Sequence, residues 1–235
     1  MTFGRAARRL GGLLGKVVVA FALMSASVVL SLRWINPPTS SFMLQQRLAG
    51  WLDGRNGSYL HHEWVDWSAI ARAVPLAVVA AEDQRFPQHR GFDLMEIRNA
   101  LEEYERTGRA RGASTISQQV AKNLFLWSDR SLIRKGLEAW FTLLIELTWS
   151  KHRILEVYLN LAQFGPDTYG VGAASWRYFD RPPAALTRHE AALMAAVLPN
   201  PERYRLDRPS RHVHRRAAWI GVQMRRLGSD YLRGL

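Results

Sequence analysis

The sequence predicts an all-α, mainly helical domain that follows one transmembrane helix at the N-terminus. An apolar run from Leu10 to Leu32 contains a single charge, Lys16, and is long enough for a bilayer-spanning helix, which takes about 20 residues. Beyond this run, apolar residues recur at three- and four-residue steps, and no sustained alternation indicates a strand. We therefore divide the chain into an anchor, residues 1–36, and an exported domain, residues 37–235.

Basic residues set the expected orientation of the anchor. Arg5, Arg8 and Arg9 precede the apolar run, so the N-terminus is expected in the cytoplasm and the remainder outside it. A cleaved signal peptide is the alternative, because Ala22 to Ser27 contains small residues that suit a peptidase. A retained anchor is favoured, since no strong Ala-x-Ala site follows the run.

The charge balance restricts the class of partner. A net charge of +12 implies an anionic partner, which is nucleic acid, acidic lipid headgroups or a phosphorylated substrate. Export disfavours nucleic acid, and neither zinc-finger spacing nor a phosphate-binding glycine-rich loop is present. From Pro201 onward the chain contains nine arginines and three acidic residues. This tail is therefore expected to be a solvated basic helix or to contact anionic headgroups.

The exported domain is expected to begin near Phe42, after a linker from Asn36 to Ser41 whose two prolines end the anchor helix. Pro75 suits the first turn of a buried helix that ends near Asp83. A weak signal suggests a short hairpin around His61 to Val65.

Local signals also mark loops and helix starts farther along the chain. The basic, glycine-containing segment Arg106 to Gly112 is expected to be a mobile loop, and Ser114 is expected to cap the helix that follows. Thr187 and Glu190 predict a capping box ahead of an apolar helix, so Glu190 is expected to be structural.

The first candidate catalytic group is Glu82. It follows the apolar run Leu76 to Ala81, so its carboxylate is expected to be partly desolvated, which raises the pKa and makes it a stronger base. Asp83 adds the repulsion of a like charge. A buried, partnered, structural role is the alternative for Glu82.

A polar helix supplies candidate binding groups. Hydroxyls, amides and an ammonium are suitable donors for sugar hydroxyls and diphosphate oxygens. A hydrated surface stripe is the alternative, but such stripes usually carry Glu and Lys instead. Two neighbouring stripes at four-residue spacing contain Ser114, Gln118 and Lys122, and Thr115, Gln119 and Asn123.

A third block places Glu138 four residues after Arg134 and three after Lys135, a spacing that intrahelical ion pairing alone would also explain. Two carboxylates in a cleft also suit a glycoside hydrolase. The cations separate the two interpretations, because fixed positive charge from Lys122, Arg134 and Lys135 would stabilise a departing diphosphate. Glycosyl transfer therefore fits better than hydrolysis.

Several blocks, in this order, resemble the motifs of the peptidoglycan glycosyltransferase family, glycosyltransferase family 51. The plan is similar to the monofunctional biosynthetic form of Gram-negative bacteria, because no Ser-x-x-Lys or Lys-Thr-Gly block of a transpeptidase is present. The resemblance covers about Trp67 to Tyr204. Its blocks are Glu82 to Gly91, Gly112 to Asn123, Arg134 to Glu138, Lys151 to Asn160, and Glu190 to Leu193 with Pro199 to Pro201.

The resemblance implies a lysozyme-like helical fold and a glycan-chain polymerase. Such an enzyme transfers the growing lipid-linked glycan to lipid II with inversion, forms β-1,4 links and releases undecaprenyl diphosphate. It would be a single-pass protein of the cell inner membrane with a cytoplasmic N-terminus and a periplasmic catalytic domain. Its partners would be lipid II, the lipid-linked glycan chain, the membrane and other cell-wall synthesis or division proteins, with no nucleic acid.

The same resemblance assigns roles to residues. Glu82 would deprotonate the acceptor 4-hydroxyl. Glu138 would assist at the donor, as the candidate ligand of a divalent cation, Mg²⁺ or Mn²⁺, with no organic cofactor. Lys151 to Asn160 would pack beneath the cleft or contact substrate. The expected substrate-binding residues are Asp83, Phe86, His89, Ser114, Thr115, Gln118, Gln119, Lys122, Asn123, Arg134 and Lys135.

Two other functions remain as alternatives. A membrane-anchored muramidase or lytic transglycosylase would cleave finished glycan and tolerate loss of Lys122 and Arg134. A non-catalytic scaffold of the cell-wall machinery would tolerate the substitution Glu82→Gln.

Overall fold

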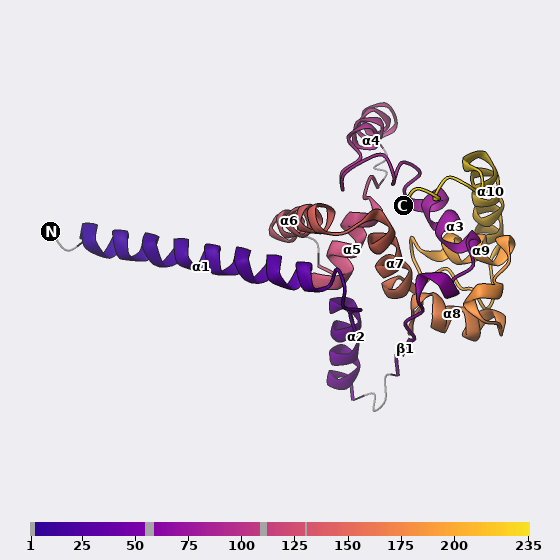
Figure 1. Ribbon diagram of the computed structural model, residues 1–235, viewed down its shortest axis with the longest axis horizontal. Coiled ribbons are helices and arrows are strands. Elements are labelled where there is room, and N and C mark those ends of the chain that lie inside the picture. Colours follow the sequence, from indigo (N-terminus) through magenta and orange to yellow (C-terminus); the bar gives the residue numbers. More distant parts are fainter. Residues whose placement is uncertain (1–2, 55–58, 109–111, 130) are drawn as a thin grey trace.

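A computed structural model describes residues 3–54, 59–108, 112–129 and 131–235, and helices dominate them (Figure 1). The prediction of a mainly α fold is confirmed. The helices are α1 (Phe3–Ser31), α2 (Ser41–Leu52), α3 (Ala73–Glu82), α4 (Leu94–Thr107), α5 (Ile116–Phe125), α6 (Leu132–Thr148), α7 (Lys151–Leu161), α8 (Gly170–Phe179), α9 (Arg188–Val197) and α10 (Arg211–Leu227), with 3-10 turns η1 (Trp67–Ala69) and η2 (Pro183–Ala185). The strands are β1 (His61–His62), β2 (Gln163–Gly165) and β3 (Thr168–Tyr169).

The three short strands form one small sheet in the order β1-β3-β2. The expected hairpin around His61 to Val65 is wrong, because β1 pairs in parallel with β3, a strand that is distant in the sequence. Packing against α8 decides this pairing. A Cβ atom on Gly172 would lie 2.7 Å from the carbonyl oxygen of Glu63, so only glycine admits this segment against the helix.

Helix α3 forms the middle of the core. Its residues from Val74 to Ala80 are all buried, and it packs against α9 and α10. A helix that is apolar on every side has to be covered on every side. The run ends at Glu82, as the sequence indicated, and this leaves a carboxylate where the core meets the surface.

Helix α1 is the one helix, among the described residues, that is long and apolar enough to cross a membrane, over Gly11–Ser31. Most of its described side chains are exposed, but its C-terminal part packs against α6. The indole nitrogen of Trp149 donates to the carbonyl of Val29 at 2.8 Å, and that of Trp140 donates to Ser25 Oγ at 3.1 Å. The anchor is therefore fixed to the domain rather than tethered to it.

The expected linker after the anchor is also held in place. The guanidinium of Arg153 donates to the carbonyl oxygen of Leu32 at 3.0 and 3.2 Å, to that of Ile35 at 2.9 Å and to Asn36 Oδ1 at 2.8 Å. Ser40 then caps α2, which begins one residue before Phe42. The buried guanidinium of Arg153 thus fixes the position of this segment. The two prolines of the segment would by themselves only prevent it from forming a helix.

Helix α10, which lies within the basic tail, is on the side of the domain away from the free end of α1 (Figure 1). It packs on α9 and α3. This placement favours the solvated alternative for the tail over contact with headgroups of the membrane that α1 would cross. The predicted capping box of α9 is confirmed, with Thr187 as the cap and Glu190 reaching back. Residues 109–111 of the expected mobile loop lie outside the described part of the chain.

Candidate active site

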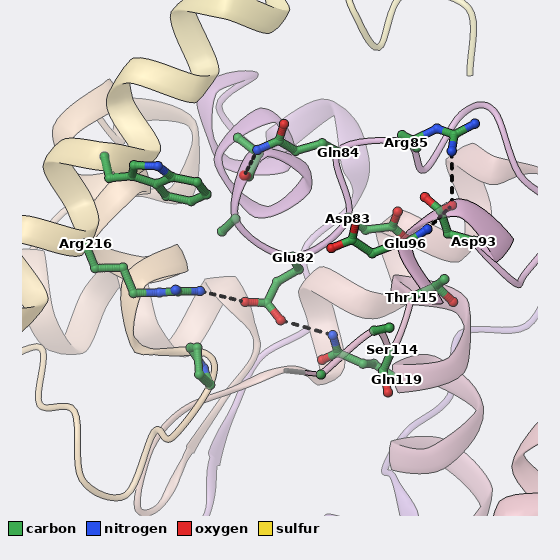
Figure 2. A pocket seen from close by; sticks show the side chains of 16 residues that line it. Glu82, Asp83, Gln84, Arg85, Asp93, Glu96, Ser114, Thr115, Gln119 and Arg216 are labelled. Carbon is green, nitrogen blue, oxygen red and sulfur yellow. Dashed lines mark hydrogen bonds and ion pairs between the residues drawn. The ribbon is translucent and has the colours of Figure 1, made fainter. Parts of the chain in front are cut away.

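A cavity of about 720 Å³ opens where α3 ends (Figure 2). Its walls come from the last turn of α3 and the segment after it, the segment that leads into α5, and one side of α10. Among its lining residues are Glu82, Gln119 and Arg216. The cavity thus joins parts of the chain that are far apart in the sequence, since Glu82 and Arg216 are 134 residues apart and meet through the packing of α10 on α3.

Glu82 is held at the cavity by two donors. Its Oε2 accepts a hydrogen bond from Gln119 Nε2 at 3.1 Å, and its Oε1 pairs with Arg216 Nη2 at 3.3 Å (Figure 2). Burial raises the pKa of Glu82, and the bond from Gln119 and the charges of Arg216 and Lys122 oppose that rise. The side chain is 13% exposed, so substrate can reach a carboxylate that is a stronger base than one in water.

Tyr158, on α7, orients Gln119. Its buried hydroxyl donates to Gln119 Oε1 at 3.2 Å, which leaves the amide NH₂ of Gln119 facing Glu82. Burial raises the pKa of Tyr158 well above its ordinary value, and the charges of Glu82 and Asp83 add to the effect. The phenol therefore stays protonated and keeps its role as a donor. At Tyr158, the block from Lys151 to Asn160 therefore packs beneath the cleft, the first of its two expected roles.

Asp83, Phe86 and His89 follow α3, and of these three only Asp83 lines the cavity. All three are buried. Asp83 lies 2.9 Å from His89 Nε2 through Oδ1, and its Oδ2 accepts from the backbone N–H of Ile116 at 2.9 Å. Asp83 thus ties the end of α3 to the first residue of α5. The ring of Phe86 carries the ammonium of Lys151 4.5 Å above its centre.

The start of α5 differs from the expectation. Thr115, not Ser114, caps the helix, and it forms a capping box with Gln118. Thr115 also donates to the carbonyl of Gly91 at 2.6 Å, a tertiary contact that selects it over the neighbouring hydroxyl. Thr115 and Gln118 are therefore buried in structural bonds, whereas Ser114 is exposed in the cavity wall.

A cluster of cations surrounds Glu138 on α5 and α6. Glu138 is buried, and its two oxygens meet Arg134 Nη1 at 3.0 Å and Lys135 Nζ at 2.5 Å. The predicted ion pairing is thus present. Burial lowers the pKa of Lys122; the charges of Glu138 and Glu82 oppose this, and those of Arg134 and Lys135 add to it. Lys122 therefore lies within the electrostatic reach of both carboxylates.

The cluster borders the cavity without lining it, and Asn123 is half-buried beside Lys122 on α5. Three cations against one carboxylate leave a local positive excess, which suits an anionic group. Within the described ranges, no group of three His, Cys, Asp or Glu side chains is placed to hold a metal ion. Because both Glu138 oxygens already face cations, these residues do not fit a divalent cation, and we derive no step through one.

Comparison with known proteins agrees with this geometry. The family described as Transglycosylase matches residues 49–225. The chain belongs to the transglycosylase family. It is 52% identical over 222 residues to a biosynthetic peptidoglycan transglycosylase of Aeromonas hydrophila. The match covers 94% of this chain and 93% of that protein.

Two further relatives carry the same name. The protein of Xanthomonas campestris is 54% identical over 208 residues, covering 88% of this chain and 85% of its own. The protein of Pseudomonas syringae is 50% identical over 221 residues, and the match covers 94% of this chain and 93% of that protein. The resemblance that the sequence motifs indicated is confirmed.

Sequence reasoning missed three residues of this transglycosylase site. Arg216 and Trp219 belong to the basic tail, which was interpreted only by its charge, and Tyr158 was noted only as part of a helical block. A signal was present for the first two, because residues three apart lie on one face of a helix. Only the packing of α10 against α3 shows which face that is.

Proposed function

We propose that this transglycosylase is a peptidoglycan glycan polymerase, which transfers the growing lipid-linked glycan to lipid II. The observation that carries the proposal is the pairing of a desolvated base, Glu82, with a cationic cluster whose Lys122 acts on both carboxylates. A base suits an acceptor hydroxyl, and fixed positive charge suits a diphosphate leaving group.

The chemistry follows from these positions. The carboxylate of Glu82 takes the proton of the acceptor 4-hydroxyl while that oxygen bonds to C1 of the donor sugar. The bond between C1 and the diphosphate oxygen breaks, and its electron pair leaves with undecaprenyl diphosphate. Attack from the face opposite the leaving group inverts C1 and forms a β-1,4 link. Lys122, Arg134 and Lys135 stabilise the charge that develops on the diphosphate.

A hydrolytic or lytic enzyme needs a carboxylic acid to protonate a poor alkoxide leaving group. Both oxygens of Glu138 meet cations, and both oxygens of Asp83 accept hydrogen bonds or face His89. All four oxygens are thus engaged by neighbouring groups, so neither side chain is free to reach a leaving group. The geometry therefore favours transfer with a diphosphate leaving group.

The membrane position supports the same proposal. We infer a single-pass protein of the inner membrane with its N-terminus in the cytoplasm and its catalytic domain in the periplasm. The basic residues before α1 support the orientation. Docking of α1 against α6 fixes the helix that carries Arg134, Lys135 and Glu138 to the proposed anchor, which suits a substrate whose diphosphate is attached to a membrane lipid.

Polymerisation of purified lipid II tests the function. We expect glycan polymer from the wild type and from Glu105→Gln, a control on the exposed surface of α4, and none from Glu82→Gln. Circular dichroism would confirm that all three are folded. Cleavage of finished peptidoglycan without polymerisation would move the chain to the lytic class. If the wild type shows neither polymerisation nor cleavage, the scaffold alternative would remain.

The divalent cation stays a prediction of the resemblance, and a chelator tests it in the same assay. If Glu138 acts only through its cations, polymerisation should continue in EDTA at the untreated rate. Loss of activity that Mg²⁺ or Mn²⁺ restores would show that the diphosphate brings a metal into the site.

A further inference from the structure

Lys122 is the member of the cation cluster that no carboxylate neutralises by direct contact. Arg134 and Lys135 both pair with Glu138, at 3.0 and 2.5 Å. Lys122 makes no hydrogen bond or ion pair with the residues that the structure describes, and Glu138 and Glu82 act on it only through their charge. Its three N–H donors are therefore left for the oxygens of a ligand.

The ring of Phe42 lies against this ammonium. Lys122 Nζ is 5.6 Å from the centre of the ring, within the distance of about 6 Å at which the face of an aromatic ring attracts a cation. Such a contact stabilises the ammonium without using any of its N–H donors. A carboxylate in the same place would instead accept a hydrogen bond and neutralise the charge. The ring thus holds the cation and leaves it available to a diphosphate.

Phe42 belongs to α2, which is fixed on the domain at several points. Helix α2 begins a short distance after α1 and turns away from it (Figure 1). It packs on α5, with Met43 fully buried. The side chain of Gln45 donates to the carbonyl oxygen of Leu126 at 3.0 Å and accepts from the backbone N–H of Ser128 at 3.2 Å. The segment that joins the two helices of the cation cluster is therefore tied to α2.

We propose that Phe42 is a positioning residue for Lys122, and that α2 thereby places the ammonium that meets the diphosphate. This inference rests on the proposed function, since it concerns a cation that would stabilise the leaving group. The ring would keep the ammonium charged and in place before substrate arrives, so that no reorganisation is needed when charge develops. Because α2 follows the segment that Arg153 fixes, the same contact connects the anchor to the reaction.

Kinetics of variants at Phe42 test the contact. Phe42→Leu keeps an apolar side chain but has no ring, and Phe42→Tyr keeps the ring face. Trp51→Leu, on the exposed side of α2, makes the same type of change elsewhere on the helix. In polymerisation of lipid II, Phe42→Leu should lower kcat about tenfold with a smaller change in KM, because Lys122 acts on charge that develops in the transition state. Phe42→Tyr and Trp51→Leu should behave like the wild type.

The pH dependence distinguishes an effect of the ring from a loss of packing. Burial lowers the pKa of Lys122, and four charges that no variant alters act on it as well. The cations lower that pKa and the carboxylates raise it; they are Arg134, Lys135, Glu138 and Glu82. The ring face favours the ammonium, so its loss in Phe42→Leu should lower the pKa further. The alkaline limb of the rate should then move to lower pH, and it should stay in place in Phe42→Tyr and Trp51→Leu.

Two further measurements support the kinetics. Fluorinated phenylalanines in place of Phe42 keep the shape of the side chain, and each added fluorine withdraws electrons from the ring face. The alkaline limb should move to lower pH in steps as fluorines are added. Acetylation of Lys122 by acetic anhydride, followed by mass spectrometry, reports the free amine without any need for catalysis. Its pH midpoint should be lower in Phe42→Leu than in Phe42→Tyr, with circular dichroism showing that each variant is folded.

The outcomes separate the inference from the function. If the wild type makes no polymer, the proposed function fails, and the acetylation midpoints still decide whether the ring holds the ammonium. If the wild type polymerises and Phe42→Leu matches Trp51→Leu in kcat, alkaline limb and midpoint, only the positioning role is overturned. A Phe42→Tyr variant as slow as Phe42→Leu, or a fluorine series without a trend, would overturn it too, because packing rather than the ring face would then hold Lys122.

Discussion

At Glu82, burial and three neighbours act on one carboxylate. Burial raises its pKa, and Gln119 and Lys122 from α5 with Arg216 from α10 oppose that rise. Tyr158 from α7 reaches it only through Gln119. The net effect is a raised pKa of Glu82, which makes its carboxylate a stronger base toward a hydroxyl proton.

The first prediction concerns the pH dependence of polymerisation. Activity needs the carboxylate, so the rate should fall as the pH drops through the raised pKa of Glu82, above the ordinary value of 4.5. Arg216→Gln removes a cation that stabilises the carboxylate, so it should move this acid limb to higher pH. Initial rates measured against pH check the shift, with Arg225→Gln as the control. An unmoved limb in Arg216→Gln would contradict the role of the ion pair.

The second prediction concerns stability. Because the folded protein raises the pKa of Glu82, the fold favours the protonated form, and stability from this group is lost as the pH rises through the folded pKa. The neutral isostere Glu82→Gln should therefore melt at the same or a higher temperature than the wild type at pH 7. The difference should shrink at pH 4. A lower melting temperature at pH 7 would show that the carboxylate contributes net stability.

Among the elements, the short segment between α1 and α2 depends on one side chain of α7. Arg153 donates to two carbonyl groups and one side chain of this segment and also pairs with Glu156 at 2.7 Å. The planar guanidinium can satisfy these groups at once, whereas an ammonium has only three donors on one atom. The anchor and the domain are joined by this geometry as well as by the packing of α1 on α6.

The third prediction follows from that geometry. Arg153→Lys keeps the charge but loses most of the hydrogen bonds, each about 1.5–3 kcal/mol for a charged group. Limited trypsin digestion in detergent should then cut after the exposed Arg33 at least about tenfold faster. Mass spectrometry identifies the cut. Equal rates of this cut in the wild type and the variant would mean that the packing of α1 alone holds the segment.

On the scale of the whole molecule, the site lies along a line that begins at the membrane helix. Helix α6, which carries Arg134, Lys135 and Glu138, packs on α1, whereas α10 lies on the side away from the free end of α1 (Figure 1). Glu82, at the end of α3, contacts Arg216 of α10. The fixed docking of α1 makes the height of the site above the membrane a property of the fold.

The fourth prediction tests the topology. The chain has no cysteine, so single substitutions can be labelled without a background. A membrane-impermeant maleimide added to intact spheroplasts should label Ser229→Cys, which lies at an exposed position after α10, and should label Thr2→Cys only after lysis. Both variants should polymerise lipid II like the wild type. The reverse labelling pattern would contradict the proposed orientation.

Local patterns in the sequence were sufficient for the helical class, the anchor, the end of α3 at Glu82 and the ion pairs within α6. Each of these depends on residues within a few turns of one another, so spacing and hydropathy describe them. The same reasoning placed the cap of α5 at Ser114 and a hairpin at β1. Both were wrong, because the carbonyl of Gly91 and strand β3 are distant in sequence and near only in space.

The sequence by itself thus determined which side chains carry charge, which segments are helices and which helix is long and apolar enough to cross a membrane. The tertiary structure alone decided which of those charges meet. Arg216 lies 134 residues from Glu82 and contacts it only because α10 packs on α3. Arg153 reaches the segment after α1 only because the fold brings the first turn of α7 to it. Ion pairs and hydrogen bonds act over a few ångströms in space, whatever the distance along the chain, so a local pattern has no means of encoding them.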